Sequence, residues 1–199
     1  MAVTRRLQAS LAGKIPLFGA ALAFFATGCA ATRPPVPRPA QALSPAELSG
    51  TWHVLESTFP MWLEGKKTDP TFTYGLLSGD ERRRMDDLVS YRKEGEPDSI
   101  AGVDTPDPED ESHFTWRGKG LLFLFKSEWY VVMRAPDRSW AVIYFSSTIA
   151  TPEGMDIIAR TRELPAETLA GIRAAIAADP TLRLKLPELK AVSRSGAPP

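Results

Sequence analysis

The feature that most constrains the fold is a series of short strand patterns separated by turn residues. Alternation of apolar and polar residues, with many β-branched and aromatic side chains, favours strands. Eight such segments occur in the middle of the chain, at 51–58, 70–75, 84–93, 98–104, 111–118, 127–135, 138–147 and 154–162. Eight short antiparallel strands in one small domain must form a sandwich or a closed barrel. Periodicity alone leaves both architectures open.

One helix pattern follows the strands. In the segment LPAETLAGIRAAIAADP, at 164–180, Leu169, Ile172 and Ile176 recur on one face. A helix with a single apolar face is expected to pack against the outside of the sheet. The alternation in TLRLKL, at 181–186, leaves a ninth strand open.

Residues 1–28 are expected to be a lipoprotein signal peptide. Arg5, Arg6 and Lys14 accompany an apolar run of 14 residues, shorter than the about 20 that a membrane-spanning helix needs. Small residues then precede Cys29, the only cysteine in the chain. This ending resembles the bacterial lipobox, which implies that Cys29 is the lipid anchor. The alternative is a secretory peptide cleaved nearby, with Cys29 incidental.

The residues after Cys29 predict how the rest of the chain is organised. Ala30, by resemblance to Gram-negative lipoproteins, implies sorting to the outer membrane with the domain facing the periplasm. The proline-rich segment 29–47 is expected to be an extended, semi-rigid linker. Residues 48–192 are expected to form one barrel domain and 193–199 a disordered tail. A single cysteine allows no intramolecular disulfide.

Charge and motifs argue against several function classes. Lys plus Arg and Asp plus Glu both number 24, so there is no basic field for nucleic acid. No hydrolase, zinc-protease or nucleotide-binding motif occurs. His53 and His113 lie in strand patterns and are expected to be barrel polar residues. Asp86 and Asp87 are neighbours on a strand, so they point to opposite faces and cannot share a proton. We therefore expect no catalytic residues, metal or cofactor.

Both ends of the domain resemble the lipocalin family. Gly50-Thr51-Trp52 resembles the family's Gly-x-Trp signature, and residues 155–172 resemble the last strand and helix of bacterial lipocalins, with Arg160 at the family arginine. Asp137 lies where the family has an acidic turn. The resemblance implies an all-β fold: an eight-stranded antiparallel up-and-down β-barrel of the lipocalin type, with a C-terminal α-helix packed outside.

In such a barrel every second connection lies at the same end. Trp52, Asp137 and Arg160 should therefore meet at a closed end, with Arg160 over the Trp52 ring. The other end should carry two apolar loops, 59–67 and 119–126. Large exposed apolar patches mark binding or membrane contact. The first loop is expected to form a lid at the mouth; in the second, 121–125 is either a loop or an extension of a neighbouring strand.

The interior of a barrel of this size holds side chains or one small ligand. The larger aromatic residues of strands six and seven are expected to face it. The predicted ligand-binding residues are Trp62, Phe123, Trp129, Met133, Trp140 and Tyr144, with Tyr91 and Trp116 as weaker candidates. Arg117 or Arg134 would meet a head group if either lay near the mouth.

The family resemblance implies a carrier of a fatty acid or lysophospholipid. Two alternatives remain. One is a structural envelope lipoprotein whose barrel is filled by side chains. The other is an enzyme acting on a bound lipid or pigment, because residues 128–132 and the following strands also resemble the lipocalin domain of plant xanthophyll de-epoxidases.

Overall fold

The computed structural model describes residues 36, 39, 41–80, 83–148 and 152–196. Cys29 and the predicted signal peptide lie outside the described residues. The elements in chain order are α1 (Pro45–Leu48), β1 (Gly50–Ser57), α2 (Pro60–Leu63), β2 (Lys67–Leu76), β3 (Met85–Lys93), β4 (Glu96–Pro106), β5 (His113–Gly118), η1 (Gly120–Leu122), β6 (Lys126–Arg134), β7 (Trp140–Phe145), β8 (Gly154–Ala159), α3 (Ala166–Ala178), η2 (Leu182–Leu184), η3 (Leu186–Glu188) and β9 (Lys190–Ala191).

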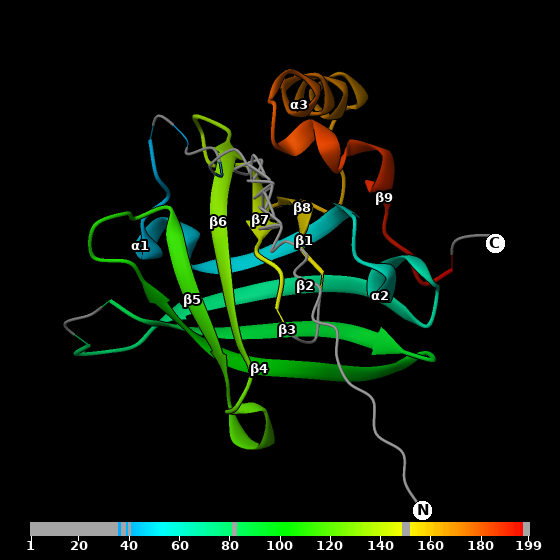
Figure 1. Ribbon diagram of the computed structural model, residues 1–199. Coiled ribbons are helices and arrows are strands. Elements are labelled where there is room, and N and C mark those ends of the chain that lie inside the picture. Colours follow the sequence, from blue (N-terminus) through cyan, green and yellow to red (C-terminus); the bar gives the residue numbers. More distant parts are fainter. Residues whose placement is uncertain (1–35, 37–38, 40, 81–82, 149–151, 197–199) are drawn as a thin grey trace, which may run out of the picture. The chain divides into compact units, whose positions relative to one another are not determined.

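The strands close into a barrel (Figure 1). Each strand from β1 to β8 pairs antiparallel with its neighbour in sequence, and β8 pairs back with β1. The short strand β9 pairs with the C-terminal end of β1, where Ala191 lies opposite Glu56. The predicted eight-stranded antiparallel barrel with a C-terminal helix is confirmed.

Two apolar segments do not form strands. Residues 121–125 leave the barrel in the η1 turn, because Gly120 adopts a φ of 57°, which extended backbone does not allow. The strand extension considered for this segment is therefore wrong. Leu182 lies in η2, where the carboxylate of Asp179 accepts the backbone N–H groups of Thr181 and Leu182 and turns the chain. The ninth strand lies at 190–191 instead.

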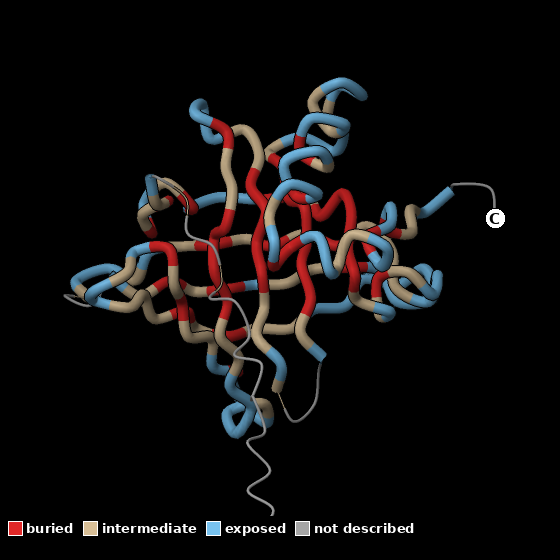
Figure 2. Tube along the Cα trace, turned by 45° about the horizontal axis from the view of Figure 1, so that its top comes forward, coloured by how far each residue is buried: buried red, intermediate tan, exposed pale blue. Residues whose placement is uncertain are grey.

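The barrel interior is closely packed at one end. Figure 2 shows buried residues running along the strands, with exposed residues gathered in the connections. Trp52, Phe114 and Trp129 are among the largest fully buried side chains. Leu43 and Leu48 are also fully buried in this core, so it includes a residue ahead of the domain start expected at Leu48.

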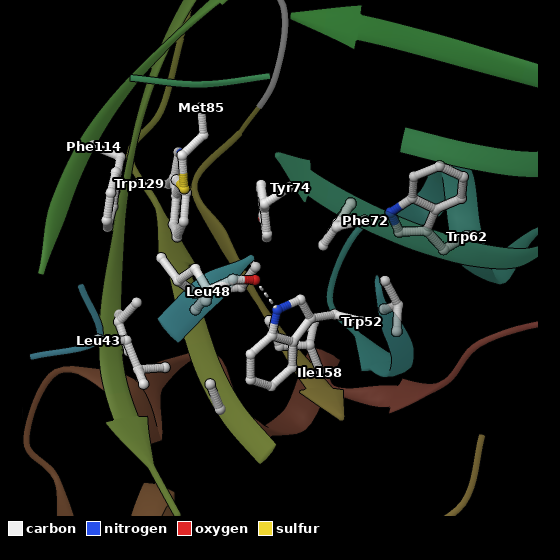
Figure 3. Close-up of a cluster of buried hydrophobic side chains, with 14 of the residues drawn as sticks. Leu43, Leu48, Trp52, Trp62, Phe72, Tyr74, Met85, Phe114, Trp129 and Ile158 are labelled. Atoms are coloured by element: carbon white, nitrogen blue, oxygen red, sulfur yellow. Dashed lines mark hydrogen bonds between the residues drawn. The ribbon is translucent and has the colours of Figure 1, made fainter. Parts of the chain in front are cut away.

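Trp52 and Arg160 close that end of the barrel. The Trp52 indole N–H donates to the Leu48 carbonyl at 2.7 Å (Figure 3). The Arg160 guanidinium lies 3.7 Å from the centre of the Trp52 ring, as predicted, and donates to the carbonyls of Glu47 at 2.7 Å and Thr51 at 3.3 Å. The cation–π contact and these hydrogen bonds tie the first strand to the end of the last.

Asp137 also lies at this end, in the turn between β6 and β7. Its carboxylate accepts the Ser139 backbone N–H at 3.1 Å and the Ser139 hydroxyl at 2.7 Å. Ser139 in turn accepts the Arg160 backbone N–H at 2.9 Å. Asp137 thus shapes the β6–β7 turn that adjoins Arg160.

The helix α3 packs on the outside of the barrel, as predicted (Figure 1). Ile172 and Ile176 are buried in a second apolar cluster with outward side chains of β6, β7 and β8. Arg173 pairs with the buried Glu56 of β1 at 2.8 Å. Because the helix covers this wall, β7 and β8 are buried on both faces.

The segment that follows β9 is bonded to the barrel. Ser193 donates its backbone N–H to the Trp62 carbonyl at 3.0 Å, and Ser195 donates to the Asp69 carboxylate at 3.0 Å. These described residues of the expected tail are therefore held in place.

Candidate functional site

A pocket of about 300 Å³ lies at the end of the barrel opposite Trp52. It is formed by α2, by the segment after η1 and by the inner faces of the neighbouring strands. Its lining comprises Phe59, Met61, Trp62, Phe72, Val89, Ile100, Trp116, Leu122, Phe125, Lys126, Ser127, Phe145, Thr148 and Asp156. Exposed side chains such as Phe125 and Lys126 place its opening at the surface.

The α2 side of the mouth is a fixed aromatic wall. Trp62 is only 4% exposed and contacts Tyr91 edge to face, with ring centres 5.5 Å apart. Phe59 meets Phe145 in the same way at 5.3 Å. Lys67 lies over the Tyr91 ring at 4.5 Å. The apolar loop after β1 therefore lines the mouth, but Trp62 is part of the wall rather than an exposed lid.

The η1 side of the mouth is exposed and apolar. Leu122 and Phe125 line the pocket, whereas Leu121, Phe123 and Leu124 project from it and are 96%, 58% and 74% exposed. The prediction that Phe123 lines the cavity is wrong, because the turn directs its side chain to solvent. Its carbonyl accepts a hydrogen bond from Arg117 at 3.1 Å.

A smaller pocket of about 110 Å³ continues the first one toward the barrel centre. The two share five lining residues, Phe72, Val89, Trp116, Ser127 and Phe145. Trp129 forms its floor, stacked on Phe114 at 4.4 Å and on Tyr74 at 5.7 Å. The predicted inward positions of Trp129 and Trp116 are therefore observed.

Three of the predicted site residues face the wrong way for a cavity role. Met133, Trp140 and Tyr144 all belong to the outer cluster beneath α3. A bulge between Val131 and Met133 shifts the alternation of β6, so Trp129 points inward and Met133 outward. Large aromatic side chains do not identify the inner face of β7, because α3 buries the outer face as well.

The interior carries three carboxyl groups that sequence reasoning missed. Asp87, Asp104 and Asp156 are 7%, 0% and 1% exposed. Asp87 lines the deeper pocket and Asp156 the outer one. Asp104 lies behind Trp129, whose indole N–H donates to it at 2.7 Å. The signal was available in principle, since alternation along each strand places these residues on the face of apolar neighbours.

Burial shifts the titration of these carboxyl groups toward neutral pH. It raises the pKa of Asp104 to about 7, against the opposing effect of the Trp129 hydrogen bond, and that of Asp156 to about 7, against the opposing effect of the Ser57 hydroxyl. Burial and then the neighbouring Asp104 raise the pKa of Asp87 well above its usual value, while the Trp116 indole lowers it. Asp87 and Asp104 lie diagonally on paired strands, because Asp87 faces Gly102 across the ladder.

The remaining candidates lie outside the pocket. His113 stacks on Tyr130 on the outer face and contacts Asp107 at 3.2 Å. The pKa of His53 is lowered by burial and then by Arg162 and Arg194. Arg134 lies at the closed end, where it donates to the Gln41 carbonyl at 2.8 Å, and so does not reach the mouth.

The described part of the chain shows no group of three His, Cys, Asp or Glu side chains that could hold a metal ion. Within these same ranges, no helix has both the length and the apolar character needed to cross a bilayer.

Known structures of the same fold were found, although no family model and no curated protein matches the sequence. Insecticyanin from the tobacco hornworm Manduca sexta is similar with a TM-score of 0.63 and 12% identity, over 81% of this chain and 86% of that one. Lobster apocrustacyanin A1 gives 0.56 and 12%, over 81% and 91%. The siderocalin Ex-FABP, described as functioning through dual ligand specificities, gives 0.54 and 16%, over 76% and 96%. At these identities the comparison establishes the fold alone: the domain is a closed eight-stranded barrel of the lipocalin type.

Proposed function

We propose that this protein is a lipid-anchored envelope lipocalin that binds one small hydrophobic ligand in the pocket between α2 and η1. The observation that carries the proposal is the apolar pocket of about 300 Å³ at one end of a barrel whose other end is closed. A pocket of this size is at the small end of those that hold organic ligands. It suits a single hydrocarbon chain better than a two-chain lipid. The resemblance of the sequence to the lipocalin family implies that the ligand is a fatty acid or a lysophospholipid.

Two further observations support a carrier role. An open pocket disagrees with a barrel filled completely by side chains, which the structural lipoprotein would have. The similar fold of Ex-FABP, a siderocalin with dual ligand specificities, shows that such a barrel can serve ligand binding. Fold alone does not fix function, so the pocket residues carry the argument.

The proposed setting is the periplasmic face of a Gram-negative outer membrane, with Cys29 as the lipid anchor. The sequence supports it through the lipobox resemblance and Ala30. The exposed Leu121, Phe123 and Leu124 beside the pocket mouth supply an apolar surface that suits exchange of ligand with a bilayer.

A pocket-filling substitution tests the binding site. Ile100 lines the pocket on β4, so Ile100→Trp should fill part of it and weaken binding of a saturated fatty acid, lysophospholipid or alcohol probe by about tenfold or more. Titration of the lipid-stripped protein, followed by tryptophan quenching, measures this. Leu88→Trp is the matched control, because Leu88 lies on the neighbouring strand β3 and is 41% exposed. Binding that is equally strong in all three proteins, or absent in the wild type, would overturn the proposal.

A further inference from the structure

The pocket contains acceptors without donors. One oxygen of Asp87, which lines the deeper pocket, has no hydrogen-bond partner among the described residues. Neither oxygen of Asp156, which lines the outer pocket, has a partner in hydrogen-bond geometry, although the Ser57 hydroxyl lies near enough to lower the pKa of Asp156. One oxygen of Asp104 is also unpaired, but it lies behind Trp129 and outside both pockets. All three side chains are more than nine-tenths buried. Buried polar groups in native proteins are nearly always paired, so unpaired acceptors at the wall of a cavity indicate a missing partner.

The three carboxyl groups all act on one buried side chain. Each of them, after burial itself, raises the pKa of the Tyr74 phenol, which is stacked on Trp129 at the floor of the deeper pocket. Asp87 and Asp156 line the two adjoining pockets from β3 and β8, which β1 and β2 separate in the closed strand order. A ligand that reaches past the aromatic mouth therefore arrives among them.

Among the described residues, no basic side chain neutralises this region. Of those that line the two pockets, Lys126 alone is basic, and it pairs with Glu128 at 3.0 Å near the surface. Lys67 lies over the Tyr91 and Trp62 rings at the mouth. A free metal ion is a poor occupant, because the described carboxyl groups do not come together in a ligating set of three.

We propose that the pocket selects a small apolar amine, which enters with its protonated nitrogen first, places it between Asp156 and Asp87 and leaves its hydrocarbon part among Phe59, Met61 and Phe145. An ammonium group has three N–H donors and no acceptor, which is the complement of the unpaired oxygens.

This inference rests on the proposed function and specifies which polar group the ligand carries. A carboxylate placed at the same depth would face acidic groups, and no basic side chain among the described residues lining the deeper pocket would neutralise it. A fatty acid could bind only with its tail inward and its head at the surface, which would leave the buried oxygens unpaired. The acidic interior therefore favours an amine over the carboxylate with the same hydrocarbon chain.

Matched probes test the preference by calorimetry at neutral pH, using octylamine, octanol and octanoate with the lipid-stripped protein. We expect octylamine to bind at least about tenfold more tightly than octanoate, the difference a desolvated charge pair makes. Octylamine should also release protons, measured as a dependence of the heat on the buffer. The reason is that a bound cation lowers the pKa of carboxyl groups that are partly protonated in the free protein.

Neighbouring aspartates on one strand provide the control. Asp87→Asn and Asp156→Asn should each weaken octylamine binding by about tenfold and reduce proton release, with octanol affinity retained. Asp86→Asn should change none of these, because Asp86 points outward to Lys119 at 2.8 Å. Melting curves verify that each variant folds.

The outcomes separate the two proposals. If octanol and octanoate bind but octylamine is no tighter than octanoate, the amine preference is wrong and the carrier role stands. If Asp87→Asn and Asp156→Asn leave octylamine affinity and proton release unchanged, the amine does not reach these groups and the inference falls. If no probe saturates the wild type while Ile100→Trp also changes nothing, the carrier role falls with it.

Discussion

Asp87 and Asp104 are buried on the paired strands β3 and β4, and Asp104 raises the pKa of Asp87. Strand alternation places Asp86 and Asp87 on opposite faces of one strand, and the structure confirms this, because Asp86 pairs with Lys119 on the outside. It did not identify the partner of Asp87, which is Asp104 on the paired strand. That proximity depends on the register of β3 against β4, in which Met85 faces Asp104. Register across a hairpin is fixed by packing and turn geometry, which one strand's pattern does not contain.

Stability should fall as the pH rises toward neutrality because of these carboxyl groups. The folded-state pKa of Asp104 is raised from 3.8 to about 7, so the native state binds more protons than the unfolded state between these values. Each such group lowers the free energy of unfolding by up to about 1.4 kcal/mol per pH unit in that window. Asp104→Asn should therefore flatten the curve of unfolding free energy against pH, measured by urea denaturation from acid to neutral pH.

The comparison with wild type isolates this effect. The pKa of Glu47 is lowered, chiefly by the hydrogen bond from the Ser44 backbone. Burial acts to raise the pKa of Asp69, but the hydrogen bonds from Ser195 and the other polar contacts lower it on balance. Their contribution has the opposite sign and is lost as the pH falls. Wild type and Asp104→Asn share this contribution, so it cancels when their unfolding free energies are subtracted. An unchanged slope in Asp104→Asn would contradict the raised pKa.

At the scale of elements, the order and type of the strands and of α3 were predictable from the sequence. Which side chains of a strand point into the barrel was not. All eight strands and α3 were expected from alternation, turn residues and the helical period, since each of these signals is local in the sequence. The inward-pointing side chains of β6 and β7 were not predicted correctly, for two reasons. A bulge at Val131–Met133 reverses the alternation within β6, and α3 makes the outer face of β7 as apolar as the inner one. Both depend on contacts distant in sequence.

The η1 element supports a prediction about the membrane. Leu121 and Leu124 are 96% and 74% exposed beside the mouth and do not line the pocket. Insertion of such side chains into a bilayer stabilises binding by about 1.5–3 kcal/mol for each fully buried leucine. Leu121→Ser with Leu124→Ser, made in a soluble Cys29→Ala background, should reduce sedimentation with phospholipid vesicles by about tenfold or more.

Ligand affinity should not change in this double variant. Leu184→Ser is its matched control, because Leu184 is 61% exposed in η2, beside α3 rather than at the mouth. Equal vesicle binding by the double variant and the control would mean that the apolar turn does not contact lipid.

At the scale of the whole molecule, the barrel has two different ends. The Trp52–Arg160 end is sealed by a cation–π contact and by hydrogen bonds to α1, and the chain enters the described domain there through Leu43 and Leu48. The other end carries the pocket and η1. A proline-rich linker from Cys29 to Leu43, extended at about 3.1 Å per residue, would span roughly 40 Å. A strand of nine residues, such as β6, spans about 30 Å. If Cys29 is lipidated as proposed and the linker is extended as the sequence predicts, the linker would be long enough for the mouth to reach a membrane.

The anchor itself is the most direct test of this arrangement. Cys29→Ala should leave the barrel folded, because Cys29 precedes every residue of the buried core, and should move the protein from the membrane fraction to the soluble one. Several acyl chains on one cysteine hold a protein firmly, whereas a single chain holds it only marginally. Metabolic labelling with palmitate followed by fractionation measures both lipidation and location. Ala30→Asp serves as the control: the lipoprotein resemblance expects it to keep the label and the membrane association but to shift the protein from the outer to the inner membrane. Wild-type protein without palmitate, or Cys29→Ala protein that stays with the membrane, would remove the anchor from the proposed function and leave the binding pocket to be explained as that of a soluble carrier.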